Sequence, residues 1–229
     1  MVVFGYFLFL AVLAGIVVIG WIGFSQDNVP AVVNVFVSGA LALLPIVIDG
    51  VGRFVASSDV GFGPWLPTAV AVIGLCHSYG MLGPYDEIWW WDHLTHTLAA
   101  AIIAALVYSA LVGINAGSNA LISALTIGYT LLIGIFWEVI ELVAREVGKQ
   151  LDVRPVLVHY GWRDTILDLV FDVVGAVIVV VVGFAPFVPI ARQYPATAGS
   201  LLEVIAGVSL VGSITLGLLV VFSLNHRQF

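Results

Sequence analysis

Three short motifs place ionisable side chains at helical spacing in a chain in which only 9% of the residues are charged. They are Asp92 with His96, Glu138 with Glu141, and a ladder of aspartates at positions 164, 168 and 172. Residues three or four positions apart lie on one side of a helix, so each motif can direct two side chains at a common point. Carboxylates gathered in an apolar bundle repel one another, and a bound divalent metal is the simplest counter-charge. The candidate metal ligands are Asp92, His96, Glu138, Glu141, Asp164 and Asp168.

The ligand types narrow the choice of metal. Carboxylate oxygens with one imidazole suit Mg, Mn, Fe(II) or Zn. The single Cys76 provides no thiolates for Cu(I) or an Fe–S cluster, and nothing in the sequence points to haem. Glu138 and Glu141 lack the ExxH partner that is typical of di-iron bundles, so a two-metal centre has no support.

Two other histidines have weaker claims to the site. His93 lies about 100° around the helix from Asp92, which makes it a poorer ligand than His96. We assign it an accessory or merely interfacial place. His77 is either a further accessory contributor or a histidine that a backbone carbonyl satisfies. Structural alternatives also stay open for Glu141, which can pair with Arg145, and for Asp164 beside Arg163.

The elements that carry these motifs are predicted to be transmembrane helices. Hydrophobic residues make up 62% of the 229 residues and the mean hydropathy is +1.15, whereas soluble domains contain roughly 25% charged residues. Apolar windows long enough to cross a bilayer lie near residues 3–24, 31–49, 64–82, 93–113, 120–143, 165–184 and 201–222. Because the backbone must satisfy its own hydrogen bonds in lipid, we predict an all-α polytopic bundle of about seven helices, forming one domain over residues 1–229.

This threading brings the motifs together. The start of the fourth span, the end of the fifth and the start of the sixth lie on one membrane face, whichever way the protein is oriented. The three motifs are therefore expected at one depth. Trp89, Trp90 and Trp91, which precede the fourth span, are typical of an aromatic belt at the headgroup level.

The distribution of positive charge predicts the orientation, since loops rich in Lys and Arg tend to remain cytoplasmic. One side of the seven-span threading carries Arg145, Lys149, Arg154, Arg163 and Arg227, and the other carries Arg53 and Arg192. We expect a multi-pass protein of the cell membrane with its N-terminus outside and its C-terminus in the cytoplasm. The net charge of −7 argues against nucleic acid as a partner. The last span contains no lysine for a retinal Schiff base.

The region from about His77 to Ala176 resembles the YjdF-like family of inner-membrane proteins. The resemblance is carried by "LCHSYGMLGPYDEIWWWDHLTH", "FWEVIELV" and "GWRDTILDLVFDVVGA". Family motifs like YDxxGH, YExxEW and WDTxxDxxxxxxGA fall here on Asp92, His96, Glu138, Glu141, Asp164, Thr165, Asp168 and Gly175. Thr95 replaces the usual glycine, and Asp172 is an acid that the family pattern does not require, so the resemblance implies only an accessory place for Asp172. A weaker likeness links the chain to VanZ-like membrane proteins, which share DxxxH at the start of a helix and a later Asp-rich helix ending in Gly.

Three hypotheses about function follow. The first is a metal-dependent enzyme that acts on a lipid-like substrate at the cytoplasmic leaflet. The second is a transporter or channel in which the same acids bind a cation or relay protons. The third is a non-catalytic subunit of a membrane complex, or a homo-oligomer, that contacts its partners through lipid-facing helices.

Overall fold

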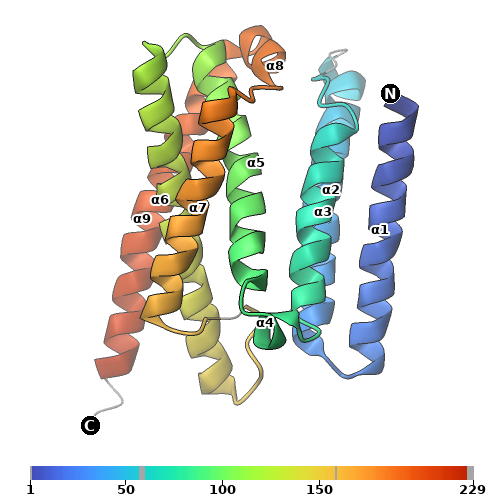
Figure 1. The fold of residues 1–229 in the computed structure, drawn as a ribbon, viewed down its shortest axis with the longest axis vertical. Helices are drawn as coiled ribbons and strands as arrows, with labels where there is room; N and C mark the ends of the chain where they lie inside the picture. The colour runs from blue at the N-terminus through green and yellow to red at the C-terminus, as the bar shows by residue number, and fades with distance from the viewer. Residues whose placement is uncertain (1, 57–59, 158, 226–229) are drawn as a thin grey trace. The chain divides into compact units, whose positions relative to one another are not determined.

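The computed structural model describes residues 2–56, 60–157 and 159–225, and their regular structure is helical throughout. The helices are α1 (Val2–Ser25), α2 (Val29–Ala56), α3 (Trp65–Gly80), α4 (Pro84–Glu87), α5 (Trp91–Gly113), α6 (Asn119–Leu151), α7 (Trp162–Val182), α8 (Val188–Gln193) and α9 (Pro195–Asn225) (Figure 1). Within the described ranges, 6 helices are long and apolar enough to cross a membrane, namely α1, α2, α5, α6, α7 and α9. The predicted fold class, a polytopic helical membrane protein, is confirmed.

The third of the seven predicted windows, residues 64–82, corresponds to α3, which has only 16 residues. At 1.5 Å per residue it is about 24 Å long, shorter than the ~30 Å hydrocarbon layer of a bilayer. The helix ends where the ring of Tyr85 covers Gly80 so closely that a Cβ on the glycine would overlap it. Hydropathy alone extends the window past this point because Met81 and Leu82 are also apolar.

The chain forms two compact units, Met1–Thr95 and His96–Phe229, and their boundary falls inside α5. In the first unit, α1, α2 and α3 pack on one another around Phe9, Ile16, Ala42 and Ala71. The Ser38 hydroxyl on α2 donates to the carbonyl of Gly74 on α3 at 3.2 Å. The short α4 follows α3 and leads into α5. The predicted single domain stays a prediction.

In the second unit, α5, α6, α7 and α9 run alongside one another (Figure 1). One cluster of small side chains joins α5 to α7 through Ala104, Ala105, Ala176 and Val179. A second cluster joins α5 and α6 to α9 through Val107, Leu111, Ile122 and Leu202. Small residues let membrane helices approach closely, since lipid supplies no hydrophobic drive to bring them together.

The outer surfaces of the helices are apolar, as a bilayer requires. On α9 the exposed side chains include Leu201, Val204, Val208 and Val211. Helix α6 is different because its 33 residues span about 50 Å and exceed the ~30 Å hydrocarbon layer. Its last turns carry Arg145, Glu146 and Lys149, so this end of α6 extends into the headgroup region or beyond.

Replacing Gly175 by alanine tests the close approach of α7 to α5. A Cβ at Gly175 would lie 2.5 Å from the carbonyl oxygen of Thr97 and 3.0 Å from the amide nitrogen of Ala101. We expect Gly175→Ala to destabilise the protein by about 1–3 kcal/mol in thermal unfolding in detergent. Gly207→Ala on α9 is the control, because a Cβ there meets nothing within 4 Å. Equal stability of the two variants would contradict the packing described here.

Candidate metal centre

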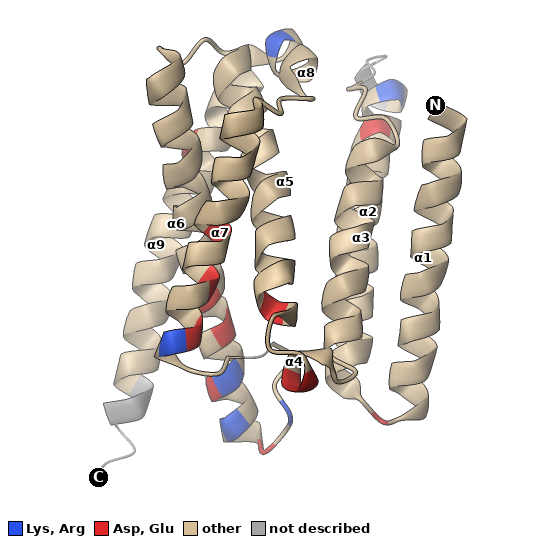
Figure 2. Cartoon of the chain, in the orientation of Figure 1, with Lys and Arg blue, Asp and Glu red and all other residues tan. Residues whose placement is uncertain are grey.

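Acidic side chains of the second unit gather in one half of the bundle. Figure 2 shows the acidic residues of α6 in its C-terminal half and those of α7 in its N-terminal half, and these two helices pack against each other. His96, near the start of α5, belongs to the same unit and contacts α7. The three helices therefore contribute ionisable groups at the same end of the unit, as the antiparallel threading predicts.

His96, Glu138 and Glu141 form the tightest group in this unit. Each offers one ligand atom, these atoms all lie within 4.8 Å of one another, and all three residues are buried. The nearest approach of His96 to Glu138 is 4.0 Å, from Nε2 to Oε1. At this separation the two side chains are too far apart for a direct hydrogen bond, but one ion can contact both. This group can hold a metal.

Asp172 fixes the orientation of the His96 ring. Its Oδ1 lies 3.2 Å from Nδ1 of His96, and both side chains are buried. If Nδ1–H donates to this carboxylate, the lone pair of Nε2 is left on the side of Glu138. Metal-binding histidines commonly donate their other N–H to a carboxylate, which sets the tautomer and makes the ring more basic. The family resemblance implied an accessory place for Asp172. Its contact with Nδ1 makes it a positioning residue for the His96 ring.

Gly134 makes room for Asp172. A Cβ on Gly134 of α6 would overlap Oδ2 of Asp172 and lie 3.3 Å from a methyl group of Leu169. Asp172 has a short side chain, so it cannot move aside without giving up its contact with His96. No sequence motif singles out Gly134. Its position one turn before Glu138 on the same helix could have pointed to a role near the acidic group. Glycines are frequent in membrane helices, however, so the position alone is not specific.

The carboxylate of Glu138 is buried with few compensating contacts. Neither oxygen meets the geometry of a hydrogen bond, although Thr165 lies close by. Leaving a charged carboxylate unpaired in an apolar interior is costly, so it is either neutralised or paired with a cation. Glu141, by contrast, accepts a hydrogen bond at 2.7 Å from Nε1 of Trp137, one turn earlier on α6. Trp137 is a contact that the sequence analysis missed.

Two aspartates on α7 occupy different settings. Asp168 is 1% exposed and lies one turn before Asp172. It offers an oxygen within 4.8 Å of a nitrogen of His96. Asp164 is partly exposed, and its Oδ2 accepts a hydrogen bond from the backbone N–H of Tyr160 at 3.1 Å. This bond satisfies a backbone donor at the start of α7, a structural task typical of acids in the first turn of a helix.

The remaining candidates lie in the first unit. Asp92 is partly buried in the first turn of α5, one helical turn before His96. His93 is buried and packs edge-on against Trp89, with ring centroids 6.4 Å apart. Trp89 itself is 82% exposed, which fits the predicted aromatic belt.

His77 has a partner that the sequence analysis did not anticipate. Its Nδ1 hydrogen-bonds the hydroxyl of Tyr85, which also lies 3.3 Å from Oγ1 of Thr95. The three residues come from α3, α4 and α5 and tie these helices together within the first unit. The sequence gives little indication of this hydrogen bond, because Tyr85 follows a Gly-Pro turn and the direction of its ring depends on where α3 ends.

Alanine at position 134 tests whether the glycine maintains the Asp172–His96 contact. We expect Gly134→Ala to lower the free energy of unfolding in detergent by about 1–3 kcal/mol, because Asp172 must shift. Gly128→Ala on the same helix carries the same gain in helix propensity, and a Cβ there meets nothing within 4 Å. If Gly134→Ala is as stable as Gly128→Ala, the proposed crowding is absent.

Comparison with known proteins places the chain among membrane proteins. No curated protein and no solved structure matches it. The family described as "Predicted membrane protein (DUF2238)" has a model that matches residues 6–187. This range begins within α1, contains α2 to α7 and every candidate ligand, and ends before α9. Because the match covers well over half of the 229 residues, the chain belongs to the DUF2238 family of predicted membrane proteins.

Proposed function

We propose that the protein is a membrane-embedded, metal-dependent enzyme that acts on a lipid-like substrate. The observation that carries this proposal is the buried group of His96, Glu138 and Glu141, whose ligand atoms lie within 4.8 Å of one another. Ionisable residues inside membrane helices are rare and are usually functional. A mixed imidazole and carboxylate set suits Zn, Fe(II), Mn or Mg.

Each residue has a task in this proposal. His96 and the two glutamates hold the ion, and Asp172 orients the His96 ring. Asp168 completes the ligand set within the second unit, and Asp92, one turn before His96 on α5, stays a predicted ligand. Asp164 is the weakest of the six predicted ligands, because one of its oxygens already serves the start of α7. When bound, the ion supplies a polarised water or activates a phosphoryl or carbonyl oxygen.

The depth of the group supports an amphipathic substrate. Glu141 lies ten residues before Leu151, about 15 Å from the end of α6. That end bears Arg145 and Lys149, so the group is close to the headgroup region rather than the bilayer centre. The same basic residues favour the cytoplasmic leaflet as the face on which the substrate is bound. The resemblance to the YjdF-like family fits this proposal but names no reaction.

Transport is the alternative that the acids also suggest, and the packing of the second unit disfavours it. Toward the other end of the unit, the buried contact between α5 and α7 consists of alanines and valines. The buried hydroxyls of Thr126 and Thr130 on α6 donate to carbonyls of their own helix. These residues offer protons and cations no continuous path away from Asp172, so we prefer catalysis at one face. The role of a non-catalytic subunit predicts that the protein does not bind metal when purified alone.

Metal analysis of the purified protein tests the proposal. We expect about one divalent ion per chain, and Glu138→Gln to abolish stoichiometric binding. Asp172→Asn should lower the metal affinity by about 10–100-fold, the effect of losing a carboxylate that orients a ligating histidine. The measurement is elemental analysis combined with a titration of the metal-depleted protein.

Glu203→Gln is the matched control, because Glu203 is an exposed residue on α9 outside the cluster. It should bind metal as the unmodified protein does. Absence of stoichiometric metal in the unmodified protein, or equal binding by Glu138→Gln and Glu203→Gln, would refute the proposed function.

A further inference from the structure

Positive charge is concentrated where α6 ends and α7 begins. The chain has seven Lys and Arg residues in all, and Arg145, Lys149, Arg154 and Arg163 are four of them. The chain as a whole carries a net charge of −7, so this segment differs in sign from the rest of the molecule. It follows the acidic group directly along α6.

Two of these cations continue the face of α6 that carries the glutamates. At 100° per residue, Glu138, Glu141, Arg145 and Lys149 fall within a sector of about 80° around the helix axis. Along the axis, Arg145 and Lys149 lie about 6 Å and 12 Å beyond Glu141. Within about three turns, this face therefore changes from buried acidic side chains to more accessible basic ones. The basic side chains lie toward the end of the helix that leaves the bilayer.

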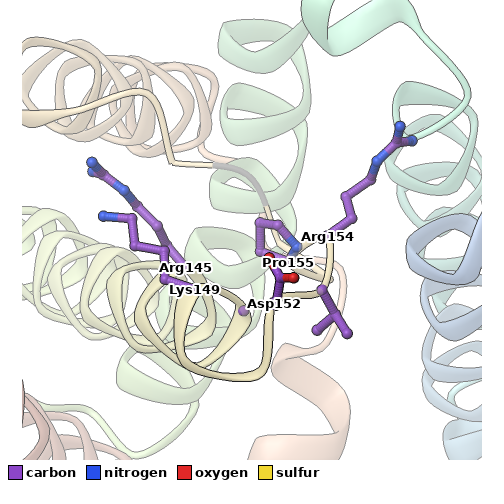
Figure 3. Close-up of a pocket in the computed structure, with 7 residues that line it drawn as sticks. Arg145, Lys149, Asp152, Arg154 and Pro155 are labelled. Atoms are coloured by element: carbon purple, nitrogen blue, oxygen red, sulfur yellow. The ribbon is translucent and has the colours of Figure 1, made fainter.

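The chain folds back over this end of α6 and forms a pocket of about 420 Å³. The lining residues are Arg145, Gly148, Lys149, Asp152, Val153, Arg154 and Pro155. Figure 3 shows Arg145 and Lys149 extending side by side, with Arg154 on the other side of Asp152 and Pro155. The fold-back needs a glycine at 148, since a Cβ there would lie 3.0 Å from the carbonyl oxygen of Val153. The volume falls in the range of small-molecule sites.

His159 adds a polar group that lies within the electrostatic influence of the same cations. Its Nδ1 is buried and has no hydrogen-bond partner among the described residues. Burial lowers the pKa of the His159 imidazole, and the nearby charges of Arg145 and Lys149 lower it further, while Asp164 acts in the opposite direction. His159 therefore lies near both basic residues, and their charges and its burial favour the neutral imidazole.

Simpler causes explain only part of this arrangement. The dipole of α6 favours a cation in the last turn, where Lys149 lies, but its effect fades within one turn and does not reach Arg145. The preference of cytoplasmic segments for Lys and Arg explains the sign of the charge. Neither cause requires a pocket in which Arg145 and Lys149 extend side by side under a folded-back chain.

We propose that Arg145 and Lys149, beside His159, bind the phosphate group of an amphipathic ligand. Guanidinium and ammonium groups form charge-assisted hydrogen bonds with phosphate oxygens. A phosphate held at Arg145 and Lys149 lies about 6–12 Å along α6 from Glu141, the nearer glutamate of the group formed by His96, Glu138 and Glu141. This inference rests on the proposed function and names a phosphate-bearing lipid as the substrate class.

Binding of a short-chain fluorescent phosphatidic acid to the full-length protein tests the inference. The protein is held in maltoside micelles, which contain no phosphate, with chelator present so that no metal contributes. We expect Arg145→Gln and Lys149→Gln each to weaken binding by about tenfold, the effect of losing one charge-assisted contact. Lys149 is exposed, so Lys149→Gln is not expected to disturb folding. Arg192→Gln on α8 removes the same charge elsewhere and should leave the affinity unchanged.

Competition identifies the source of the phosphate. Displacement of the probe by inorganic phosphate at similar affinity assigns the site to free phosphate, and displacement by unlabelled phosphatidic acid alone assigns it to a lipid headgroup. Both outcomes support a phosphate site. Equal binding of phosphatidic acid and an uncharged diacylglycerol of the same chain length, or an equal loss in Arg192→Gln, would overturn it.

The titration of His159 supplies an independent readout. A bound phosphate adds negative charge beside the imidazole and should raise its pKa, against the lowering by burial and Arg145. Nitrogen NMR of histidine-labelled protein, assigned with His159→Gln, measures this change. A pKa that does not move when saturating phosphatidic acid is added would place the ligand elsewhere.

The two proposals can fail separately. If Glu138→Gln abolishes metal binding but the Arg145 and Lys149 variants bind phosphatidic acid normally, the metal centre stands and the phosphate site fails. If the protein binds no metal but these variants lose phosphatidic acid, the phosphate site stands and the proposed enzyme fails.

Discussion

Carboxylates and an imidazole are buried together between α5, α6 and α7, and the free energy needed to keep them there constrains the second unit. A charge moved from water to an apolar interior must be paired, hydrogen-bonded or neutralised. The contact of Asp172 with His96 and that of Trp137 with Glu141 meet part of this requirement. Glu138 has no comparable bond. A cation held by His96, Glu138 and Glu141 would balance the charge that these contacts leave.

The packing of the helices serves this group. Gly134 leaves the space that the Asp172 carboxylate occupies, and Gly175 lets α7 approach the backbone of α5. Small residues continue this close packing toward the other end of the unit, where the buried contact between α5 and α7 is apolar. The polar half and the apolar half of the same helices thus have separate tasks. One half holds the buried ionisable side chains, and the other holds the helices in register through close contact.

The sequence predicts the helices well, and it places the motif residues on shared helix faces, because both depend on local properties. Hydropathy over twenty residues locates a span, and helical spacing places two side chains on one face. The length of α3 was harder to predict, since its end depends on Tyr85 packing over Gly80. The same holds for Asp172, whose partner His96 is 76 residues away in the chain. The sequence already left a structural alternative open for Asp164 beside Arg163, but it could not show the hydrogen bond with the Tyr160 backbone, which forms only where the chain turns into α7.

Pulsed electron paramagnetic resonance of the protein loaded with Mn²⁺ and labelled with ¹⁵N-histidine tests the central claim most directly. It detects whether a histidine nitrogen is bonded to the metal. Our account predicts one ¹⁵N coupling, and His96→Gln removes it. His93→Gln, which changes a histidine three residues earlier on the same helix, leaves the coupling intact. A Mn²⁺ signal without nitrogen coupling, or a coupling that survives His96→Gln, would contradict a metal centre built on His96, Glu138 and Glu141.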